Sequence, residues 1–306
     1  MKSIAFIGLG IMGRPMATNL AQAGYEVRGY ARSESTRERA GQAGVPVAAS
    51  VAAAVEGADI VITMLPDTPD VLGVCEGPDG LLQVLTPGTV FVDMSTIEPA
   101  ASQDLADRFA ERGIDVLDAP VSGGEQAAIE GILSVMVGGN EDVLERVRPL
   151  LETVGKTVVH VGPAGSGQVT KAANQLMVAL HLQALSEATL FLERSGVAVD
   201  KALQVIAGGL AGSTVLERKK TSVLTRSYAP GFRLELHHKD LGIVQKSARD
   251  LGVALPGTAL VSSLVQSLVA RGDGGLDHSA LFKLTTELNQ VGAPARANAH
   301  STGELS

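Results

Sequence analysis

Six residues near the start of the chain restrict its fold more than any other segment. Gly8-Leu9-Gly10-Ile11-Met12-Gly13 follows the apolar run Ile4–Ile7 and opens the amphipathic stretch Met12–Ala23. Between a strand and a helix, a G-x-G-x-x-G pattern allows a tight turn and a close approach of backbone to a pyrophosphate. The helix N-terminus also attracts phosphates. The hexapeptide therefore predicts a dinucleotide-binding site, with a glycine-rich turn that binds nothing as the alternative.

The first half of the chain alternates strand-like and helix-like segments. The strand-like runs are Ile4–Ile7, Glu26–Tyr30, Ile60–Thr63, Thr89–Val92, a run ending near Leu117, Val135–Val137 and Thr157–Val161. The amphipathic stretches include Met12–Ala23, Ser33–Ala43, Pro99–Arg112 and Glu141–Val154. This alternation predicts a Rossmann-type, doubly wound parallel sheet with helices on both faces.

The second half of the chain reads as helices only. Residues 168–194 form one uninterrupted helical pattern, apolar nearly all round from Leu176, which predicts a helix buried on most sides. Such a helix would be a spine between domains or a subunit interface. Further helices are expected at Val199–Ala207, Ser213–Leu224, Lys239–Leu251, Thr258–Ala270 and Ser279–Val291. The predicted fold class is α/β plus all-α, with a dinucleotide-binding domain at 1–163, an interdomain helix at 164–195, a helical domain at 196–292 and a disordered tail at 293–306.

Composition disfavours several classes of partner. The formal net charge of −8 disfavours nucleic acid and anionic membranes, and 3% aromatic residues without Trp disfavour a base-stacking surface. No apolar run approaches the ~18 residues that a membrane span needs. The single cysteine, Cys75, can form no intramolecular disulfide, so we expect a cytoplasmic protein. Cys75 also has no activating base near it in the sequence, which argues against a catalytic thiol. No group of His, Cys, Asp and Glu has metal-ligand spacing, so no metal is expected.

The end of the second strand bears on the choice of dinucleotide. An acidic residue at this position would bind the ribose 2′-hydroxyl of NAD. Here Ala31-Arg32-Ser33 follows Glu26–Tyr30, and Glu34 comes too late. Arg32 and Ser33 can instead hold a 2′-phosphate, which favours NADP(H) and leaves NAD(H) possible. The alternative for Arg32 is a solvated surface charge stacked on the adenine.

Two later segments carry candidate chemistry. In Asp118-Ala119-Pro120-Val121-Ser122-Gly123-Gly124, the residues Ser122, Gly123 and Gly124 can present consecutive N–H groups to a carboxylate, unless the segment is an ordinary turn. In Gly167–Asn174, Lys171 and Asn174 share a helical face with Gln175 and Val178. A lysine in the first turn of a buried helix opposes the helix dipole, and desolvation would lower its pKa. Lys171 is therefore a candidate acid/base and Asn174 a substrate partner, with a snorkelling surface lysine as the alternative.

The segment His237-His238-Lys239-Asp240 lies just before a predicted helix. Adjacent histidines point in different directions and do not make a metal site. Lys239 can contact anions of a cofactor or substrate, and Asp240 can orient a lysine. The alternative is a helix-capping cluster.

Taken together, these motifs resemble the β-hydroxyacid dehydrogenase family from Ile4 to about Val291. The residues that carry the resemblance are Ile4–Met16, Met64-Leu65-Pro66, Asp93-Met94-Ser95-Thr96-Ile97, Asp118–Gly124 and Gly167–Asn174. A narrower similarity to the branch that reduces tartronate semialdehyde rests on Gly208–Leu216, Pro230-Gly231-Phe232, Leu236–Leu241 and Asp277–Leu281.

The resemblance implies a role for each motif. Lys171 would be the catalytic lysine with Asn174 at the reacting oxygen, and Ser122, Gly123 and Gly124 would bind the substrate carboxylate. Phe232 would line the pocket. Leu65, Pro66, Ser95 and Thr96 would flank the nicotinamide and its ribose, and Lys239 would close over the cofactor. The expected reaction is hydride transfer between NAD(P)H and a small aldehyde acid or hydroxyacid, in a homodimer or homotetramer.

Other readings of the sequence stay open. A 3-hydroxyisobutyrate dehydrogenase or another short β-hydroxyacid dehydrogenase would have the same motifs, because a pocket separates a methyl from a hydroxyl group only weakly. A dinucleotide-binding module without turnover is the alternative from another class, although Lys171 and Asn174 argue against it. Lys171 also argues against imine reductases and chromatin-associated members, in which this lysine is typically replaced.

Overall fold

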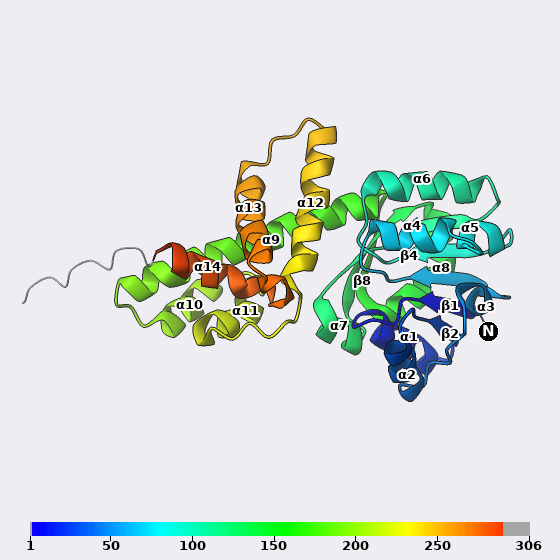
Figure 1. Ribbon diagram of the computed structural model, residues 1–306, viewed down its shortest axis with the longest axis horizontal. Helices are drawn as coiled ribbons and strands as arrows, with labels where there is room; N and C mark the ends of the chain where they lie inside the picture. Colours follow the sequence, from blue (N-terminus) through cyan, green and yellow to red (C-terminus); the bar gives the residue numbers. More distant parts are fainter. Residues whose placement is uncertain (1, 290–306) are drawn as a thin grey trace, which may run out of the picture.

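A computed structural model describes residues 2–289 of the protein, shown in Figure 1. A sheet covered by helices forms one part, and helices alone form the other. The strands are β1 (Ser3–Ile7), β2 (Glu26–Tyr30), β3 (Ile60–Thr63), β4 (Val90–Asp93), β5 (Asp115–Asp118), β6 (Val121–Ser122), β7 (Leu133–Gly139) and β8 (Gly155–Gly162). The helices around them are α1 (Gly13–Gln22), α2 (Glu34–Gln42), α3 (Val51–Val55), α4 (Thr68–Glu76), α5 (Leu81–Val84), α6 (Pro99–Ala110), α7 (Gly124–Glu130) and α8 (Glu141–Val154).

The strand order confirms the doubly wound arrangement. The sheet runs β2-β1-β3-β4-β5-β7-β6, with β8 beside β7, and β1 to β5 pair in parallel. The order reverses at β1, which lies between β2 and β3. In open α/β sheets a ligand crevice forms outside the carboxyl ends of the strands at such a point.

The expectation of a wholly parallel sheet is wrong at one side. Strand β7 pairs antiparallel with both β5 and β6, and parallel with β8. Only the short α7 with Gly123, Gly131 and Ile132 connects β6 to β7. A parallel crossover needs a dozen or more residues, so this connection returns the chain antiparallel.

Alternation along β1 divides the core between the two faces of the sheet. Ile4 and Phe6 join a cluster with residues of α1, α7 and α8, whereas Ala5 and Ile7 join a cluster with residues of α3 to α6. Figure 1 shows α4, α5 and α6 on one side of the sheet and α1 on the other. Helices on both faces explain why the central strands β1, β3 and β4 are almost entirely buried and mostly apolar.

Helix α9 (Ser166–Arg194) extends from the sheet into the helical part (Figure 1). It packs first on β7 and β8 and then against the helices that follow it. These are α10 (Val199–Ala207), α11 (Thr214–Thr225), α12 (Leu234–Asp250), α13 (Pro256–Ala270) and α14 (Leu281–Leu288), with 3₁₀ turns η1 (Asp273–Gly275) and η2 (His278–Ala280). Side chains such as Ala179, Leu182 and Leu185 form its buried face.

One side of α9 differs from the expectation of burial. Met177 and Phe191 are 55% and 71% exposed. By length and composition alone, α9 is also apolar enough to cross a membrane, although its sequence holds no unbroken apolar run of that length. Its packing against α11 to α14 accounts for much of that apolar composition.

The predicted start of one helix is wrong. We expected the segment His237–Asp240 to precede a helix, but α12 begins at Leu234, so the segment lies inside its first two turns. Leu234, His237 and Leu241 are all buried at helical spacing, which explains why the histidine continues the helix instead of preceding it. The predicted tail at 293–306 lies outside the described residues.

Candidate active site

The glycine turn after β1 is shaped for a dinucleotide. Gly8 has φ +102°, and a Cβ there would lie 2.3 Å from the Met64 carbonyl oxygen. A Cβ on Gly13 would lie 1.9 Å from the Gly8 carbonyl oxygen, so the first turn of α1 needs glycine to approach the strand. Gly10 meets no atom within 4 Å, which leaves its backbone open to a ligand. These three positions fit a bound pyrophosphate.

The end of β2 places Arg32 and Ser33 differently. The Arg32 side chain is 92% exposed, with its guanidinium 4.0 Å from the Asp70 carboxylate. Ser33 caps α2, because its hydroxyl accepts from the Thr36 amide (3.3 Å) and donates to the Thr36 hydroxyl (2.7 Å). The guanidinium is therefore available for a ligand, whereas the serine hydroxyl already has protein partners.

The structure brings together the loops that follow β3 and β4. Ser95 Oγ accepts from the Leu65 amide (2.9 Å), so Leu65-Pro66 and Ser95-Thr96 form one edge. Gln168 Nε2 of α9 donates to the Ser95 carbonyl (2.8 Å) and ties this edge to the start of α9. The predicted residues thus line the carboxyl ends of neighbouring strands, where a nicotinamide would lie.

The start of α9 is held by Asp118 at the end of β5. One carboxylate oxygen accepts from the Gly165 amide (2.8 Å) and the other from the Gln168 amide (2.9 Å). Burial raises the pKa of Asp118 to about 6, although these hydrogen bonds favour the ionised form. Gly167 packs so closely on the sheet that a Cβ would lie 2.4 Å from the Met136 carbonyl oxygen. These contacts set the position of the next turn, which carries Lys171.

Lys171 is buried at the junction of the two parts. It lies in the second turn of α9, not the first as expected, because the helix begins at Ser166. Its ammonium donates to the Val121 carbonyl (2.7 Å) and to Gln175 Oε1 (3.2 Å). Burial lowers the pKa of Lys171 from its ordinary 10.5 to about 8, against the attraction of Asp240. The predicted lowering is confirmed, with desolvation as its cause, and the lysine can exchange a proton near neutrality.

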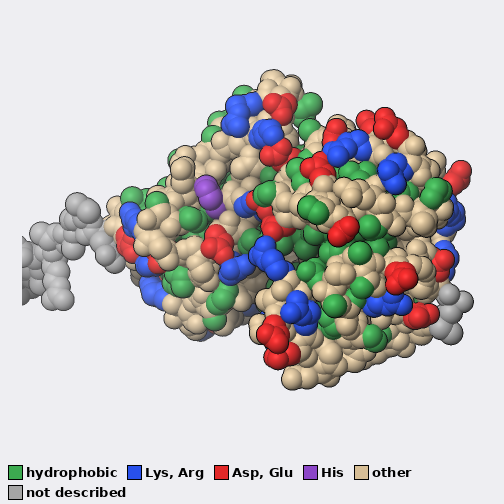
Figure 2. Space-filling model, turned by 45° about the vertical axis from the view of Figure 1, so that its right-hand side comes forward, with side chains coloured by type: hydrophobic (Ala, Val, Ile, Leu, Met, Phe, Trp, Pro, Cys, Tyr) green, Lys and Arg blue, Asp and Glu red, His purple; other side chains and the backbone are tan. Residues whose placement is uncertain are grey.

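A network of amides and charges surrounds this lysine. Asn174 Nδ2 donates to Gln175 Oε1 (2.9 Å), and Asn174 Oδ1 lies 3.5 Å from the Ser122 hydroxyl. Asp240 accepts from Gln175 Nε2 and lies 2.8 Å from the Lys239 ammonium. Lys239 in turn donates to the Thr96 carbonyl (2.7 Å) across the border between the parts. Figure 2 shows acidic and basic side chains gathered along this border.

Ser122, Gly123 and Gly124 lie beside the lysine, from the last residue of β6 to the first residue of α7. Gly123 and Gly124 have φ +141° and +73°, conformations that side chains rarely adopt. Arg218 of α11 donates to the Gly123 carbonyl (2.7 Å), so a cation from the helical part lies against this turn. A positive side chain beside a glycine turn suits a carboxylate ligand.

Phe232 belongs to an aromatic group at the start of α12. Its ring lies 5.9 Å from that of His237 and 5.4 Å from that of His278. His237 contacts the Gln175 carbonyl (3.2 Å), so the group adjoins the turn of α9 that carries Lys171. Burial lowers the pKa of both His237 and His278, which favours neutral rings.

Sequence reasoning missed four residues of this site. Gln175 was placed on the face of Lys171 without a role, and Asp118, Gln168 and Arg218 were given none. Spacing along α9 was a usable signal for Gln175. No signal was available for Arg218, since its contact joins residues that are 95 positions apart.

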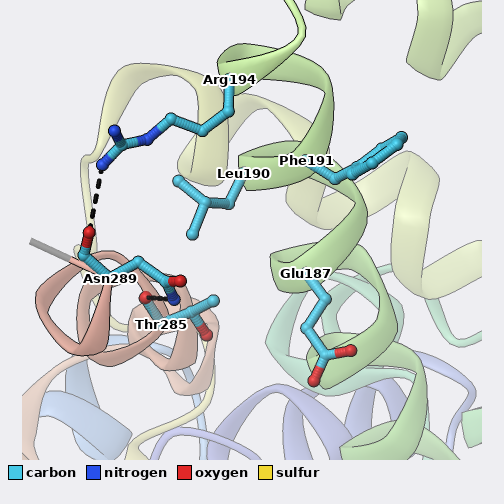
Figure 3. Close-up of a pocket in the computed structure, with 6 residues that line it drawn as sticks. All are labelled: Glu187, Leu190, Phe191, Arg194, Thr285 and Asn289. Carbon is cyan, nitrogen blue, oxygen red and sulfur yellow. Dashed lines mark hydrogen bonds between the residues drawn. The ribbon is translucent and has the colours of Figure 1, made fainter. Parts of the chain in front are cut away.

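A pocket away from this site lies between α9 and α14 (Figure 3). It is lined by Glu187, Leu190, Phe191, Arg194, Thr285 and Asn289. Arg194 donates to the Asn289 carbonyl (3.2 Å) across it. In Figure 3 the Phe191 ring points away from Leu190 and Thr285. This pocket contains none of the predicted site residues.

A dinucleotide turn and a buried lysine of lowered pKa between two parts define a nicotinamide-dependent oxidoreductase. Comparisons with known proteins give its family. A family model described as the NAD binding domain of 6-phosphogluconate dehydrogenase matches residues 3–162, and one described as NAD-binding of NADP-dependent 3-hydroxyisobutyrate dehydrogenase matches 165–285. The chain belongs to the β-hydroxyacid dehydrogenase family, near the tartronate semialdehyde reductases.

Three relatives illustrate this membership. The 2-hydroxy-3-oxopropionate reductase of Escherichia coli (strain K12) is 44% identical over 92% of this chain and 96% of its own. The NAD-dependent L-serine dehydrogenase of Pseudomonas aeruginosa is 38% identical over 93% of this chain and 98% of its own. The solved structure of Mycobacterium tuberculosis 3-hydroxyisobutyrate dehydrogenase with L-serine has a TM-score of 0.85, 34% identity, and coverage of 92% and 98%. The protein is therefore an NAD(P)-dependent oxidoreductase that acts on a CH–OH group.

Proposed function

We propose that the protein reduces 2-hydroxy-3-oxopropanoate (tartronate semialdehyde) to D-glycerate with NAD(P)H. The observation that carries the proposal is the buried Lys171, with its pKa lowered to about 8, beside Ser122 and Asn174. The 44% identity to 2-hydroxy-3-oxopropionate reductase supports this substrate.

The residues of the site have distinct tasks in this reaction. Backbone amides of Ser122, Gly123 and Gly124 hold the substrate carboxylate, with Asn174 beside the aldehyde oxygen. When bound, the reduced nicotinamide supplies the hydride that adds to the aldehyde carbon. Lys171 hydrogen-bonds the aldehyde oxygen and donates a proton as negative charge develops there. Hydride and proton together convert the aldehyde to the alcohol, and the lysine leaves the step neutral.

The same geometry suggests which residues would hold the cofactor. Gly8, Leu9, Gly10, Ile11, Met12 and Gly13 would bind the pyrophosphate through the turn and the start of α1. Leu65, Pro66, Ser95 and Thr96 would flank the nicotinamide and its ribose. Lys239 would close over them from α12, which its hydrogen bond to the Thr96 carbonyl supports.

We propose a preference for NADPH over NADH. No acid stands at the end of β2, and the exposed Arg32 guanidinium can pair with a 2′-phosphate. We expect Arg32→Glu to reverse the ratio of kcat/KM for the two cofactors, because a carboxylate repels the phosphate. Steady-state rates with each cofactor test this, and an unchanged ratio would show that Arg32 does not contact the 2′ position.

The experiment that tests the function follows the absorbance of the reduced nicotinamide. Purified protein is assayed with 2-hydroxy-3-oxopropanoate and, separately, with methylmalonate semialdehyde. We expect oxidation of NADPH with the first substrate, and a loss of about 100-fold or more in Lys171→Ala with dinucleotide binding retained. Full turnover by the variant would overturn the mechanism.

Two alternatives have distinct outcomes in the same assay. Preference for methylmalonate semialdehyde would indicate a 3-hydroxyisobutyrate dehydrogenase with the same site. Tight dinucleotide binding without turnover of either substrate would indicate a binding module, against which the arrangement of Lys171 and Asn174 argues.

We also propose a homodimer or homotetramer in the cytoplasm. The exposed apolar side of α9, with Met177 and Phe191, is the surface that a second copy would cover. The single cysteine, Cys75, forms no intramolecular disulfide, which is in keeping with a reducing compartment. A monomeric mass by light scattering at micromolar concentration would contradict the assembly.

A further inference from the structure

Gln175 lies at the centre of the site, although the proposed chemistry gives it no task. It follows Lys171 by one turn of α9 and is 5% exposed. Its Oε1 accepts from the Lys171 ammonium (3.2 Å) and from Asn174 Nδ2 (2.9 Å), and its Nε2 donates to the Asp240 carboxylate. One buried amide therefore contacts both candidate catalytic residues and a buried acid on α12.

Hydrogen-bond chemistry makes this contact directional. An ionised carboxylate only accepts hydrogen bonds, so Asp240 requires the NH₂ group of Gln175 to face it. The Gln175 carbonyl oxygen must then face Lys171 and Asn174. Because that oxygen only accepts, it in turn requires the NH₂ group of Asn174, which leaves Asn174 Oδ1 directed at the Ser122 hydroxyl. The orientation of both amides thus follows from Asp240.

Gln175 is also a neutral bridge between two opposite charges. Lys171 and Asp240 each bond to this amide, and no direct ion pair joins them in the described residues. The charged groups that act on Lys171 are Asp240 and Lys239, both on α12, and neutral His237 lies on the same helix. A carboxylate in direct contact would favour the charged lysine and raise its pKa. The lowered pKa of about 8 is consistent with the charges being held apart.

We infer that Gln175 is a positioning residue. Its hydrogen bond to Asp240 fixes the orientation of its amide, and this amide then orients Lys171 and Asn174 and separates the Lys171 ammonium from the Asp240 carboxylate. Lys239 extends this chain of contacts to the Thr96 carbonyl on the sheet part. The two parts are thereby connected through the lysine site. This inference rests on the proposed function, because it assigns Gln175 to the same proton donor.

Two substitutions test the inference, because they should shift the pH at which Lys171 loses its proton in opposite directions. The fall of kcat at high pH, called the pH limb below, reports this shift. Gln175→Met keeps the length of the side chain and removes the acceptor, so the charged lysine loses a hydrogen bond and its pKa falls further. Gln175→Glu places an ionisable carboxyl against the ammonium and raises the lysine pKa. In Gln175→Met we expect kcat for aldehyde reduction to fall at a lower pH than in wild type. In Gln175→Glu the fall should occur about one pH unit or more above that of wild type.

The values of kcat and of the dinucleotide dissociation constant give a second test of the positioning role. Gln175→Met should lower kcat about 100-fold, because misplaced groups lose the reactive geometry, with the dissociation constant of the dinucleotide unchanged. Gln266→Met, at an exposed position of α13, is the matched control and should leave kcat and the pH limb as in wild type. Thermal melting of all variants separates misfolding from mispositioning.

The outcomes separate this inference from the proposed function. If Lys171→Ala abolishes turnover but both Gln175 variants keep the wild-type pH limb and kcat, Gln175 has no positioning role. If both variants lower kcat and shift the limb in the same direction, the bridging role is wrong. If Lys171→Ala keeps turnover, the proposed function itself fails.

Discussion

At the scale of single residues, the site depends on a cation kept in a desolvated position. Lys171 has two acceptors in the described residues, the Val121 carbonyl and Gln175, so one proton of its ammonium is left for a substrate oxygen. Burial is the main cause of its lowered pKa. Such a group donates a proton readily at neutral pH, which an exposed lysine does poorly.

The pH dependence of turnover follows from this lysine. In the proposed mechanism aldehyde reduction needs charged Lys171, so we expect kcat to be level below its pKa and to fall above about pH 8. Alcohol oxidation needs the neutral lysine, so its rate should rise with pH and level off above about 8. Steady-state kcat measured in both directions from pH 6 to about 10 tests this. A reductive rate that is constant over this range would contradict it.

A second residue-scale prediction concerns stability. Asp277 is buried and pairs with Lys219 (2.8 Å), while its oxygens also accept from the Gly231, Phe232 and Ser279 amides. Burial alone would raise the pKa of Asp277, but the hydrogen bond and charge of Lys219, with the hydrogen bond from Ser279, hold it well below its usual range. Asp277→Asn should therefore cost about 3 kcal/mol of unfolding free energy, because a nearly buried ammonium loses its partner.

Acid dependence provides the control for this prediction. A carboxyl with a lowered folded-state pKa contributes its full stability above its unfolded value of about 4, and this is lost as the pH falls further. Denaturant unfolding should show a smaller loss of stability below about pH 4 in Asp277→Asn than in wild type. An equal loss of unfolding free energy in the variant and in wild type would mean that the Asp277–Lys219 pair does not cause the destabilisation by acid.

At the scale of elements, the site is built where helices begin against strands. The glycine turn leads from the end of β1 into α1, and the Asp118 carboxylate at the end of β5 accepts hydrogen bonds from the N-terminus of α9. Both arrangements bring a helix N-terminus to the carboxyl edge of the sheet. Lys171 reaches the site because α9 begins there and not one turn later.

Substitutions in the glycine turn should separate packing from binding. Gly13→Ala would place a methyl 1.9 Å from the Gly8 carbonyl oxygen, so we expect a loss of about 1–3 kcal/mol in unfolding free energy. Gly10→Ala meets no protein atom within 4 Å and should keep wild-type stability. It should still weaken dinucleotide binding, because its methyl obstructs the pyrophosphate. Thermal melts and fluorescence titrations measure both, and unchanged binding by Gly10→Ala would contradict this use of the turn.

At the scale of the whole molecule, the two parts are joined by contacts around the site. Lys239 donates to the Thr96 carbonyl, Lys246 pairs with Glu98, and Arg218 donates to the Gly123 carbonyl. The sheet part holds the glycine turn and the loop proposed for the substrate carboxylate, whereas α11 and α12 supply cations. The proposed site therefore needs residues of both parts.

Arg218 tests this view, because it joins α11 to the turn proposed for the substrate carboxylate. Arg218→Ala removes a positive charge and a 2.7 Å hydrogen bond at Gly123. We expect KM for the aldehyde acid to rise about tenfold, equivalent to about 1.4 kcal/mol, with dinucleotide binding unchanged. Arg249→Ala, exposed near the end of α12, is the matched control. A wild-type KM in Arg218→Ala would remove this arginine from substrate binding.

The sequence by itself determined the fold class and the elements that carry the candidate site, and its motifs gave the resemblance to the family. Local patterns were sufficient for the fold class and the elements, since the glycine turn, the strand periodicity and the helical face of Lys171 depend on near neighbours. Only the tertiary structure decided the antiparallel β7, the start of α12 at Leu234, the exposed side of α9, and the meeting of Gln175, Asp240 and Arg218. These features depend on contacts between distant segments and on burial, which local periodicity does not encode.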